Sequence, residues 1–369
     1  MWHGKAKTEY PDTEGRRLLA VSDIHGNLEY FDGLLKKAGW NIQADELFIV
    51  GDFLEKGKSS LNVLKNVMDL YSKGHVHVIA GNCDTWSVMF SQNPVNDPRL
   101  LAYFRRMKCG IIWDMCESLG IDLENAKNLD ECRRLLPQAY QKELTFLTSL
   151  STAAETEHYI FVHSGMNRAK PLTENTQDEV LKHDFFRIDA PKAKPEDKWI
   201  IAGHTPVVLY RENTVNANPL IDREKKLISI DGGCVLKDDG QLNMLIIPYE
   251  GSEDFTFTYY DPFPEAIVED TQEASEHSWY IRWGDNEVEV LERGEEFSRC
   301  RHTRTGYEAD ILTKYLFTRE RITRCNDCTD YYLPLSPGDT VSIVEECSDR
   351  YFVKHNGISG WYKGRLKKI

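Results

Sequence analysis

The sequence predicts an α/β fold followed by a smaller all-β region. Three short apolar segments suit buried strands, 18–22, 46–50 and 76–80, and they alternate with two amphipathic segments that suit helices, 28–38 and 61–71. Each apolar segment runs into a polar loop, and strands that alternate with helices in this way are typical of a parallel sheet. A chain of 369 residues is too long for one ordinary domain, so we expect two.

The pattern resumes after a helical insert, because residues 94–150 are mainly helical by periodicity. Four further segments read as strands: 159–162, 199–202, 227–230 and 242–247. A second region begins after Asp261, where two prolines and an acidic stretch are typical of a linker, and alternating residues from Trp279 onward predict strands. The expected organisation is a tail at 1–15, a main α/β domain at 16–262, an acidic linker at 263–277 and an all-β domain at 278–369.

The composition excludes several classes of function. A net charge of −14 argues against general nucleic-acid binding, which depends on Lys and Arg neutralising phosphates. The sequence contains no apolar run long enough for a signal-peptide core or a membrane-spanning helix, so we expect no membrane segment. Nine scattered cysteines, an odd number, suit free thiols in a reducing compartment. We therefore expect a cytoplasmic protein.

Polar side chains collect where the predicted strands end, and open α/β sheets bind ligands beyond the carboxyl ends of their strands. Carboxylate, imidazole and amide groups without thiolates suit Mn, Fe, Zn or similar divalent ions, and an Asp shared between two ions would give a two-metal phosphoester site. One such residue alone is usually a loop cap. Six in consistent positions predict a metal site: Asp23, His25, Asp52, Asn82, His163 and His204.

Five ordered blocks, spanning roughly residues 16–260, resemble the calcineurin-like metallophosphoesterases, and within them the bacterial phosphoprotein phosphatases. The blocks are Ser22-Asp23-Ile24-His25-Gly26, Gly51-Asp52-Phe53-Leu54-Glu55-Lys56-Gly57, Gly81-Asn82-Cys83-Asp84, Val162-His163-Ser164-Gly165 and Gly203-His204-Thr205-Pro206. The resemblance implies a sandwich of two mixed β-sheets flanked by helices, with two divalent ions at its top. It also implies the ligands, with Asp52 as the bridge: Asp23, His25 and Asp52 for one ion, and Asp52, Asn82, His163 and His204 for the other.

The chain departs from the family pattern at the residues that would assist the leaving group. Where the phosphatases usually have Gly-Asn-His-Glu, with the His donating a proton, this chain has Cys83, and Glu55 and Lys56 replace an Asp-Arg pair. Dications beside the thiol would favour its thiolate, which cannot donate a proton, and Lys lacks the planar fork of Arg. Arg187 lies where the phosphatases have a second phosphate-binding Arg, although a surface Arg is an equal alternative. We expect a preference for esters whose leaving group departs without help.

The C-terminal segments around Gly338, Tyr351 and Gly360-Trp361-Tyr362 resemble the bacterial Src-homology-3-like barrel. Such barrels usually bind peptides, cell-wall fragments or a neighbouring domain, and a barrel that only packs on the catalytic domain is at least as good an interpretation. Cys325 and Cys328, with Cys300 and Cys347, would make a weak four-thiolate zinc motif, and unligated thiols are the better interpretation.

The leading hypothesis is a dinuclear-metal-dependent phosphoester hydrolase, a phosphatase or phosphodiesterase that uses a metal-activated water. Lys56 and Arg187 would offset the charge of the substrate, which would be a phosphoprotein, a nucleotide or dinucleoside polyphosphate, or another small phosphorylated molecule. The alternatives are a serine/threonine protein phosphatase proper, or a catalytically weak regulatory or scaffold protein that acts through its C-terminal barrel. Retention of all six predicted ligands argues against the scaffold, because an idle site has no physical reason to keep them together.

Overall fold

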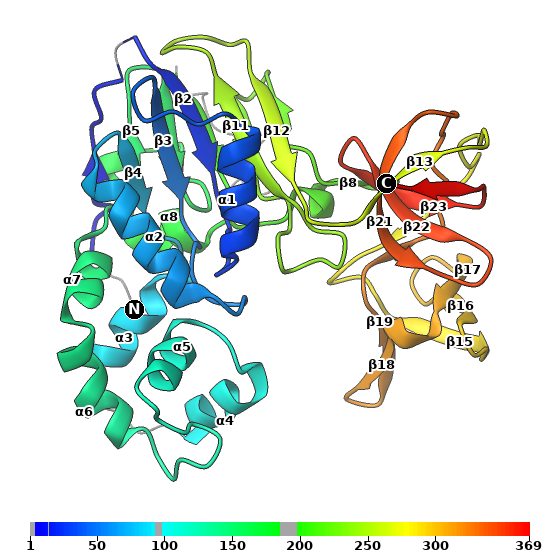
Figure 1. Ribbon diagram of the computed structural model, residues 1–369, viewed down its shortest axis with the longest axis horizontal. Helices are drawn as coiled ribbons and strands as arrows, with labels where there is room; N and C mark the ends of the chain where they lie inside the picture. Colours follow the sequence, from blue (N-terminus) through cyan, green and yellow to red (C-terminus); the bar gives the residue numbers. More distant parts are fainter. Residues whose placement is uncertain (1–3, 14, 93–97, 185–197) are drawn as a thin grey trace. The chain divides into compact units, whose positions relative to one another are not determined.

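A computed structural model describes residues 4–13, 15–92, 98–184 and 198–369 (Figure 1). Its chain divides into two compact units. The first comprises Met1–Pro206, Pro219–Leu236 and Gly240–Asp261, and the second comprises Val207–Asn218, Lys237–Asp239 and Pro262–Ile369. Among the described residues, no helix has the length and apolar character to cross a membrane.

The first unit contains a five-stranded mixed sheet in the order β12-β11-β2-β3-β4. Strands β2 (Arg17–Val21), β3 (Asp45–Val50) and β4 (Val76–Ile79) are parallel, as the alternation of strands and helices predicts. β11 (Leu242–Ile247) runs antiparallel beside β2, and β12 (Thr256–Tyr260) forms the antiparallel edge. β3 is buried along its whole length, which explains its continuous apolar sequence from Leu47 to Val50.

A second, six-stranded mixed sheet has the order β1-β5-β6-β7-β10-β9. Its strands are β1 (Thr8–Glu9), β5 (Ala153–Glu155), β6 (Tyr159–Val162), β7 (Trp199–Ala202), β10 (Leu227–Ser229) and β9 (Leu220–Asp222). β6, β7 and β10 are parallel, so they end on the same side of the sheet. The two sheets pack face to face, and the rings of Phe48 on β3 and Phe161 on β6 stack with centroids 3.9 Å apart.

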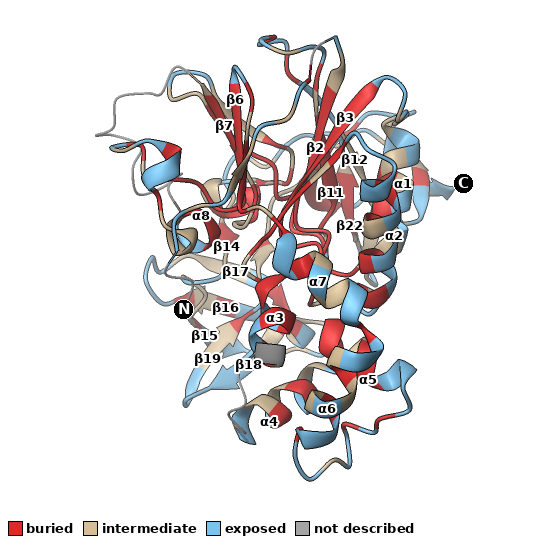
Figure 2. Cartoon of the chain, turned by 90° about the vertical axis from the view of Figure 1, so that its left-hand side faces the viewer, coloured by how far each residue is buried: buried red, intermediate tan, exposed pale blue. Residues whose placement is uncertain are grey.

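Helices flank this sandwich (Figures 1 and 2). α1 (Leu28–Lys37) and α2 (Ser60–Ser72) bury Phe31, Leu34 and Leu64 in the core of the five-stranded sheet. The short helix α8 (Gln177–Lys182) packs Val180 and Leu181 against β6 and β7, and the 3₁₀ turn Leu172–Glu174 precedes it. The fold is therefore the predicted α/β sandwich of two mixed sheets with helices around it.

The insert between β4 and β5 is helical, as its periodicity predicts. It consists of α3 (Thr85–Gln92), α4 (Pro98–Met107), α5 (Ile111–Ser118), α6 (Asp130–Ala139) and α7 (Gln141–Ser149). Apolar residues of the insert join the same core as α1 and α2. In Figure 2, α3 lies next to α7 at the end of the insert that is nearest to the sheets.

The second unit is rich in antiparallel strands. Its largest sheet has the order β24-β13-β21-β22-β23-β8, formed by Leu366–Lys368, Glu265–Val268, Thr340–Glu346, Tyr351–His355, Ile358–Tyr362 and Val215–Asn216. Because its pairings run from the edge strand β24 to the edge strand β8, this sheet is open within the described residues. The resemblance to a closed Src-homology-3-like barrel is therefore not confirmed. β13 lies inside the stretch 263–277 that the sequence suggested as a linker.

Smaller sheets complete this unit. They contain β14 (Tyr280–Ile281) with β20 (Cys328–Thr329), β15 (Val288–Glu292) with β16 (Phe297–His302) and β17 (Glu308–Leu312), and β18 (Leu316–Arg319) with β19 (Ile322–Cys325). Two 3₁₀ turns, Val207–Tyr210 and Thr313–Tyr315, also belong to it.

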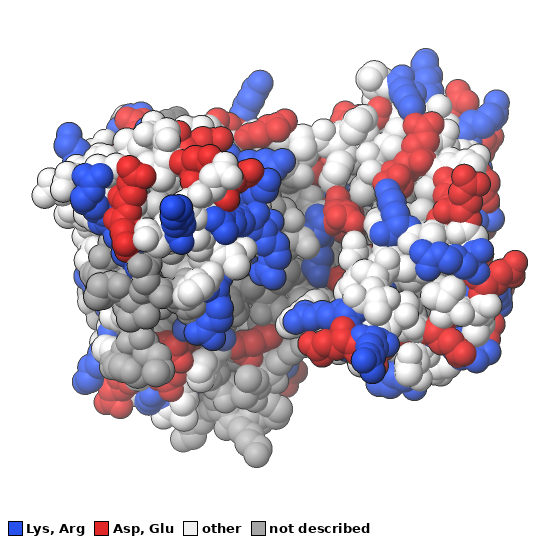
Figure 3. Space-filling model, turned by 90° about the horizontal axis from the view of Figure 1, so that it is seen from below, with Lys and Arg blue, Asp and Glu red and all other residues white. Residues whose placement is uncertain are grey.

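All nine cysteines of the chain are free thiols. Basic and acidic side chains are interspersed over the face drawn in Figure 3.

Candidate metal centre

All six residues predicted as metal ligands lie in loops that follow the carboxyl ends of strands. Asp23 and His25 follow β2, Asp52 follows β3, and Asn82 follows β4 in the five-stranded sheet; His163 and His204 follow β6 and β7 in the other. Because the two sheets are packed face to face, these loops meet at one end of the sandwich. The side chains of Asp23, His25, Asp52 and His163 are almost fully buried there.

The side chains form one continuous cluster. Nε2 of His163 lies 3.3 Å from Oδ1 of Asp52 and 3.2 Å from Nδ1 of His204, and the Asn82 amide lies 3.2 Å from the same His163 nitrogen. Nε2 of His25 lies 3.7 Å from Oδ1 of Asp23. Two groups of potential ligand atoms result, each with its atoms within 4.8 Å of one another: His25, Asp52 and Cys83, and Asp52, His163 and His204. Asp52 belongs to both groups.

The backbone holds these loops in an unusual conformation. Asp23, His25, Asp52 and His204 all have positive φ angles between 50° and 70°, in the left-handed region that residues other than glycine rarely adopt. Hydrogen bonds between the loops maintain it: the backbone N–H of His204, for example, donates to Oδ2 of Asp23 at 2.9 Å. Strained backbone of this kind occurs mainly where function requires a fixed geometry.

Two glycines allow the loops to approach closely. A Cβ atom at Gly81 would overlap the Asp52 carboxylate, and one at Gly203 would overlap the carboxylate of Asp23. The glycines of the Gly81-Asn82 and Gly203-His204 blocks are therefore required by the packing of the two carboxylates.

The imidazoles are oriented by backbone carbonyls. The carbonyl of Val50 lies 3.1 Å from Nδ1 of His163, and the carbonyl of Leu54 lies 3.4 Å from Nδ1 of His25. With Nδ1 engaged, each ring directs Nε2 toward the carboxylates, which is how histidine ligands are usually fixed.

The electrostatics of the cluster fit a cation. Burial raises the pKa of Asp23 well above its usual value, and the neighbouring carboxylate of Asp231 raises it further. Burial opposes a charged His163, but Asp52 outweighs this effect and raises the pKa of His163 to about 10. Burial and the neighbouring His163 lower the pKa of His204 to about 4. Crowded carboxylates that repel one another are relieved when a positive charge lies between them.

The donor set also fits divalent ions. Oδ1 of Asp23 is buried and accepts no hydrogen bond from the described residues, although a buried carboxylate oxygen normally has a partner. The surrounding atoms are carboxylate oxygens, imidazole nitrogens, an amide and the sulfur of Cys83, a set that suits ions such as Mn, Fe or Zn. The residues present therefore fit a metal centre.

The structure also includes two buried carboxylates that the sequence-based ligand set omits. Asp84 accepts hydrogen bonds from the backbone N–H groups of Asp52, Leu54 and Gly81, at 2.8, 3.0 and 2.8 Å. Asp231 is fully buried and acts electrostatically on Asp23. Both follow buried strands in the sequence, which is the same signal that identified Asp23 and Asp52.

The predicted catalytic residues have different environments. Cys83 is buried beside the cluster, and its backbone N–H donates to Oδ1 of Asp52 at 2.8 Å. The Glu55 carboxylate accepts a hydrogen bond from the backbone N–H of Ile111 at 3.1 Å, so it anchors the start of α5. Lys56 acts electrostatically on both His25 and Cys83. Arg187 lies outside the described residues.

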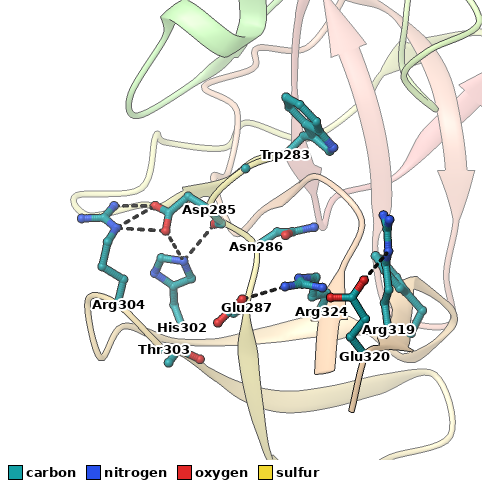
Figure 4. A pocket seen from close by; sticks show the side chains of 12 residues that line it. Trp283, Asp285, Asn286, Glu287, His302, Thr303, Arg304, Arg319, Glu320 and Arg324 are labelled. Atoms are coloured by element: carbon teal, nitrogen blue, oxygen red, sulfur yellow. Dashed lines mark hydrogen bonds and ion pairs between the residues drawn. The ribbon is translucent and has the colours of Figure 1, made fainter. Parts of the chain in front are cut away.

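A separate cavity of about 560 Å³ lies within the second unit, and none of the predicted site residues lines it (Figure 4). Its wall carries the exposed ring of Trp283 and three arginine–carboxylate ion pairs, of which the one between Arg319 and Glu320 is the longest at 3.9 Å. Nε of Arg304 lies 2.9 Å from Oδ1 of Asp285, and Nη2 of Arg324 lies 2.8 Å from Oε1 of Glu287. Because each of these arginines is paired with a carboxylate, the ion pairs give the cavity wall no net charge.

A sandwich of two mixed sheets with carboxylates, imidazoles and an amide at converging strand ends is the arrangement of a metal-dependent phosphoester hydrolase. The model of the calcineurin-like phosphoesterase family matches residues 16–229. The chain belongs to this family.

The chain is similar to bis(5'-nucleosyl)-tetraphosphatases and to a serine/threonine phosphatase structure. The chain is 25% identical over 237 residues to the asymmetrical bis(5'-nucleosyl)-tetraphosphatase PrpE of Bacillus subtilis (strain 168), a match that covers 58% of this chain and 85% of the relative. It is 42% identical over 64 residues to a symmetrical bis(5'-nucleosyl)-tetraphosphatase of Buchnera aphidicola, which covers 17% of this chain and 23% of that protein. A serine/threonine phosphatase structure from Saccharomyces cerevisiae aligns with 70% of this chain and 84% of its own, at 10% identity and a TM-score of 0.43.

Proposed function

We propose that the centre holds two divalent ions and that Asp52 bridges them. The observation that carries this proposal is that the Asp52 carboxylate belongs to both groups of potential ligand atoms. Asp23 and His25 would complete the ligands of one ion. Asn82, His163 and His204 would complete those of the other. The hard oxygen and nitrogen donors support manganese, iron or zinc.

The ions, when bound, would supply Lewis acidity and a reactive water for attack on phosphorus. Side chains of the protein would compensate the charge of the substrate and hold the loops of the centre in position. Lys56, beside His25 and Cys83, would offset the negative charge of the substrate. Asp84 would hold the loops of Asp52 and Gly81 in place. Arg187 stays a predicted second phosphate contact.

The substrate that we favour is a dinucleoside polyphosphate or a related nucleotide. Two bis(5'-nucleosyl)-tetraphosphatases are among the relatives, and one of them aligns over 85% of its length. The cysteine at position 83 also favours a nucleotide substrate, because this position lacks an imidazole that would protonate the leaving group. A nucleotide phosphate departs as a stable anion, whereas the alkoxide of phosphoserine needs a proton.

The test is a comparison of three substrates with the full chain and added manganese: a dinucleoside tetraphosphate, a phosphoserine peptide and bis(p-nitrophenyl) phosphate. We expect the highest kcat/KM for the dinucleoside tetraphosphate and the lowest for the peptide. A protein that hydrolyses the phosphoserine peptide most efficiently would instead be a serine/threonine protein phosphatase.

The cellular compartment of the protein and the partner of its C-terminal unit do not follow from the metal centre. The nine free thiols support a reducing compartment, and we propose the cytoplasm. A peptide partner for the C-terminal unit stays a prediction. The retained metal centre argues against a scaffold whose only function would lie in that unit.

A further inference from the structure

The first turn of α3 is fixed to the loop that contributes Asn82 and Cys83. The Thr85 hydroxyl donates to the carbonyl of Asn82 at 2.7 Å, and the backbone N–H of Trp86 donates to the carbonyl of Cys83 at 3.2 Å. Figures 1 and 2 place α3 at the end of the helical insert that is nearest to the sheets. The backbone of Trp86 is therefore hydrogen-bonded to the loop that carries Asn82 and Cys83.

The outer face of α3 is aromatic and apolar, although it faces solvent. Trp86 is 40% exposed and Met89, one turn later, is 42% exposed, whereas Ser87, Val88 and Phe90 are buried. The core of the insert therefore does not require a large ring at position 86. A single exposed apolar side chain is common on protein surfaces, so the relevant feature is that Trp86 and Met89 are exposed together on the helix that directly follows the Asn82 loop.

The ring of Trp86 is held rigidly from one side. The Tyr103 ring of α4 stacks on it with centroids 5.9 Å apart and an interplanar angle of 6°, and the guanidinium of Arg106 lies 5.7 Å from the centroid of Tyr103. An ordered stack of this kind costs little additional entropy when a further ring is added to it.

Tyr103, the partner of Trp86 in the stack, is under the electrostatic influence of two predicted catalytic residues, Lys56 and Glu55. Burial raises the pKa of Tyr103, while the charge of Lys56 opposes this shift and the carboxylate of Glu55 adds to it. The same Lys56 acts on His25. The aromatic stack is therefore joined to the Asn82 loop through the backbone of Trp86, and Lys56 acts electrostatically on its Tyr103.

We propose that Trp86, supported by Tyr103, is the platform on which a base of the nucleotide substrate stacks. This proposal rests on the function proposed above and adds the residue that distinguishes a nucleotide from a bare polyphosphate. Every nucleobase has a π-face, so a platform of this kind accepts adenine and guanine alike, and it strengthens binding by about tenfold.

The experiment measures binding of AMP and of inorganic tripolyphosphate to the manganese-loaded full chain, with Trp86→Leu and Trp86→Phe as variants. Leu keeps an apolar side chain but removes the π-face, and Phe restores a ring. We expect Trp86→Leu to weaken AMP binding by about tenfold and leave tripolyphosphate binding unchanged, and Trp86→Phe to recover most of the loss. Trp283→Leu, in the second unit and 75% exposed, is the matched control and should change neither affinity.

A second readout needs no variant, because a stacked base quenches indole fluorescence. AMP should quench part of the emission of the wild-type chain, and tripolyphosphate at equal saturation should not. An equal loss of tripolyphosphate binding in Trp86→Leu, unchanged AMP binding in that variant, or absence of AMP-specific quenching would each overturn the proposal. Failure of the manganese-loaded wild type to hydrolyse a dinucleoside tetraphosphate would instead refute the proposed function. The binding measurements do not depend on hydrolysis, so the two failures can be told apart.

Discussion

The carboxylate of Asp84 accepts a hydrogen bond from the backbone N–H of Asp52 at 2.8 Å, and so fixes the residue that both groups of potential ligands share. Its two oxygens also accept from Leu54 and Gly81, so one buried side chain joins the loops after β3 and β4. This arrangement makes Asp84 a positioning residue, which acts on the metal centre through the backbone.

Replacement of Asp84 by Asn should weaken metal binding without removing a ligand. The amide would turn an NH₂ group toward backbone N–H groups that need an acceptor, so the Asp52 loop would lose part of its support. We expect metal affinity to fall by about 10- to 100-fold, as for other groups that orient ligands. Titration with manganese measures this. Asp69→Asn, at an exposed carboxylate on α2, is the control, and an equal effect of both variants would contradict the positioning role.

Replacement of Cys83 by His should change the relative activity on different leaving groups. The new imidazole can protonate an alkoxide, so kcat/KM for a phosphoserine peptide should rise relative to that for a dinucleoside tetraphosphate. We expect a relative gain of about tenfold, below the roughly 100-fold lower end of general acid catalysis, because one oxygen of Glu55 already accepts a hydrogen bond from Ile111 and the carboxylate is less free to orient the ring. Cys83→Ser controls for loss of the thiol. No relative gain, together with a wild type that is efficient on phosphoserine, would refute the role assigned to this position.

The stability of the sandwich should depend on pH through His77 and Glu46. Nε2 of His77 lies 2.8 Å from Oε2 of Glu46, on neighbouring strands. Burial opposes protonation of His77, but Glu46 and Glu9 outweigh it and raise the pKa of His77 to about 9. Because the pKa of His77 is higher in the folded chain than in the unfolded chain, protonation of this ring stabilises the fold. The stabilisation is complete at pH values below the unfolded pKa of about 6.5, and it is lost as the pH rises through about 9.

His77→Gln should therefore lower the free energy of unfolding more at pH 6 than at pH 9.5, by on the order of 2 kcal/mol. Urea unfolding at the two pH values measures the difference. His158→Gln, at a ring that is 47% exposed, is the control and should show a much smaller pH-dependent change. A cost for His77→Gln that is the same at both pH values would contradict the ion pair.

The C-terminal end point of a truncated chain should determine how strongly the isolated first unit aggregates. A fragment that ends at residue 277 retains β13 without its partners β21 and β24, so Ala266 and Val268 lose their cover. A fragment that ends at Asp261 lacks β13. We expect both fragments to bind manganese and the shorter one to aggregate less, which light scattering can measure. Equal aggregation would show that β13 is not the reason, and loss of metal binding in both would show that the unit does not fold by itself.

The sequence predicts the α/β class and the six potential ligands because both follow from a local signal, an apolar strand that ends in a polar loop. The sandwich of two mixed sheets follows from the resemblance to the calcineurin-like metallophosphoesterases. Local pattern does not identify Asp84 as a positioning residue, because two of its three donors, Asp52 and Leu54, lie in the loop after β3, and only the parallel packing of β3 and β4 brings that loop to Asp84. The pairing of Trp86 with Tyr103 is equally non-local, since it joins two helices of the insert.

The C-terminal unit is harder to predict for the same reason. Its largest sheet recruits β8 at Val215–Asn216, far earlier in the chain than its partner β23. β13 is taken from a stretch whose acidic and proline-rich composition resembles a linker. Local alternation identifies individual strands, but it does not identify which distant strand pairs with which, so the open sheet differs from the expected barrel.

Metal content and activity, measured together, test the central claim most directly. The full chain and Asp52→Asn are loaded with manganese, their bound metal is quantified, and hydrolysis of a dinucleoside tetraphosphate is followed before and after chelation. Because Asp52 belongs to both groups of potential ligands, we predict up to two ions per wild-type chain, activity that chelation abolishes and manganese restores, and a folded variant that has lost both ions and activity. A metal-free chain with full activity, or an Asp52→Asn variant that binds two ions and turns over normally, would contradict the account.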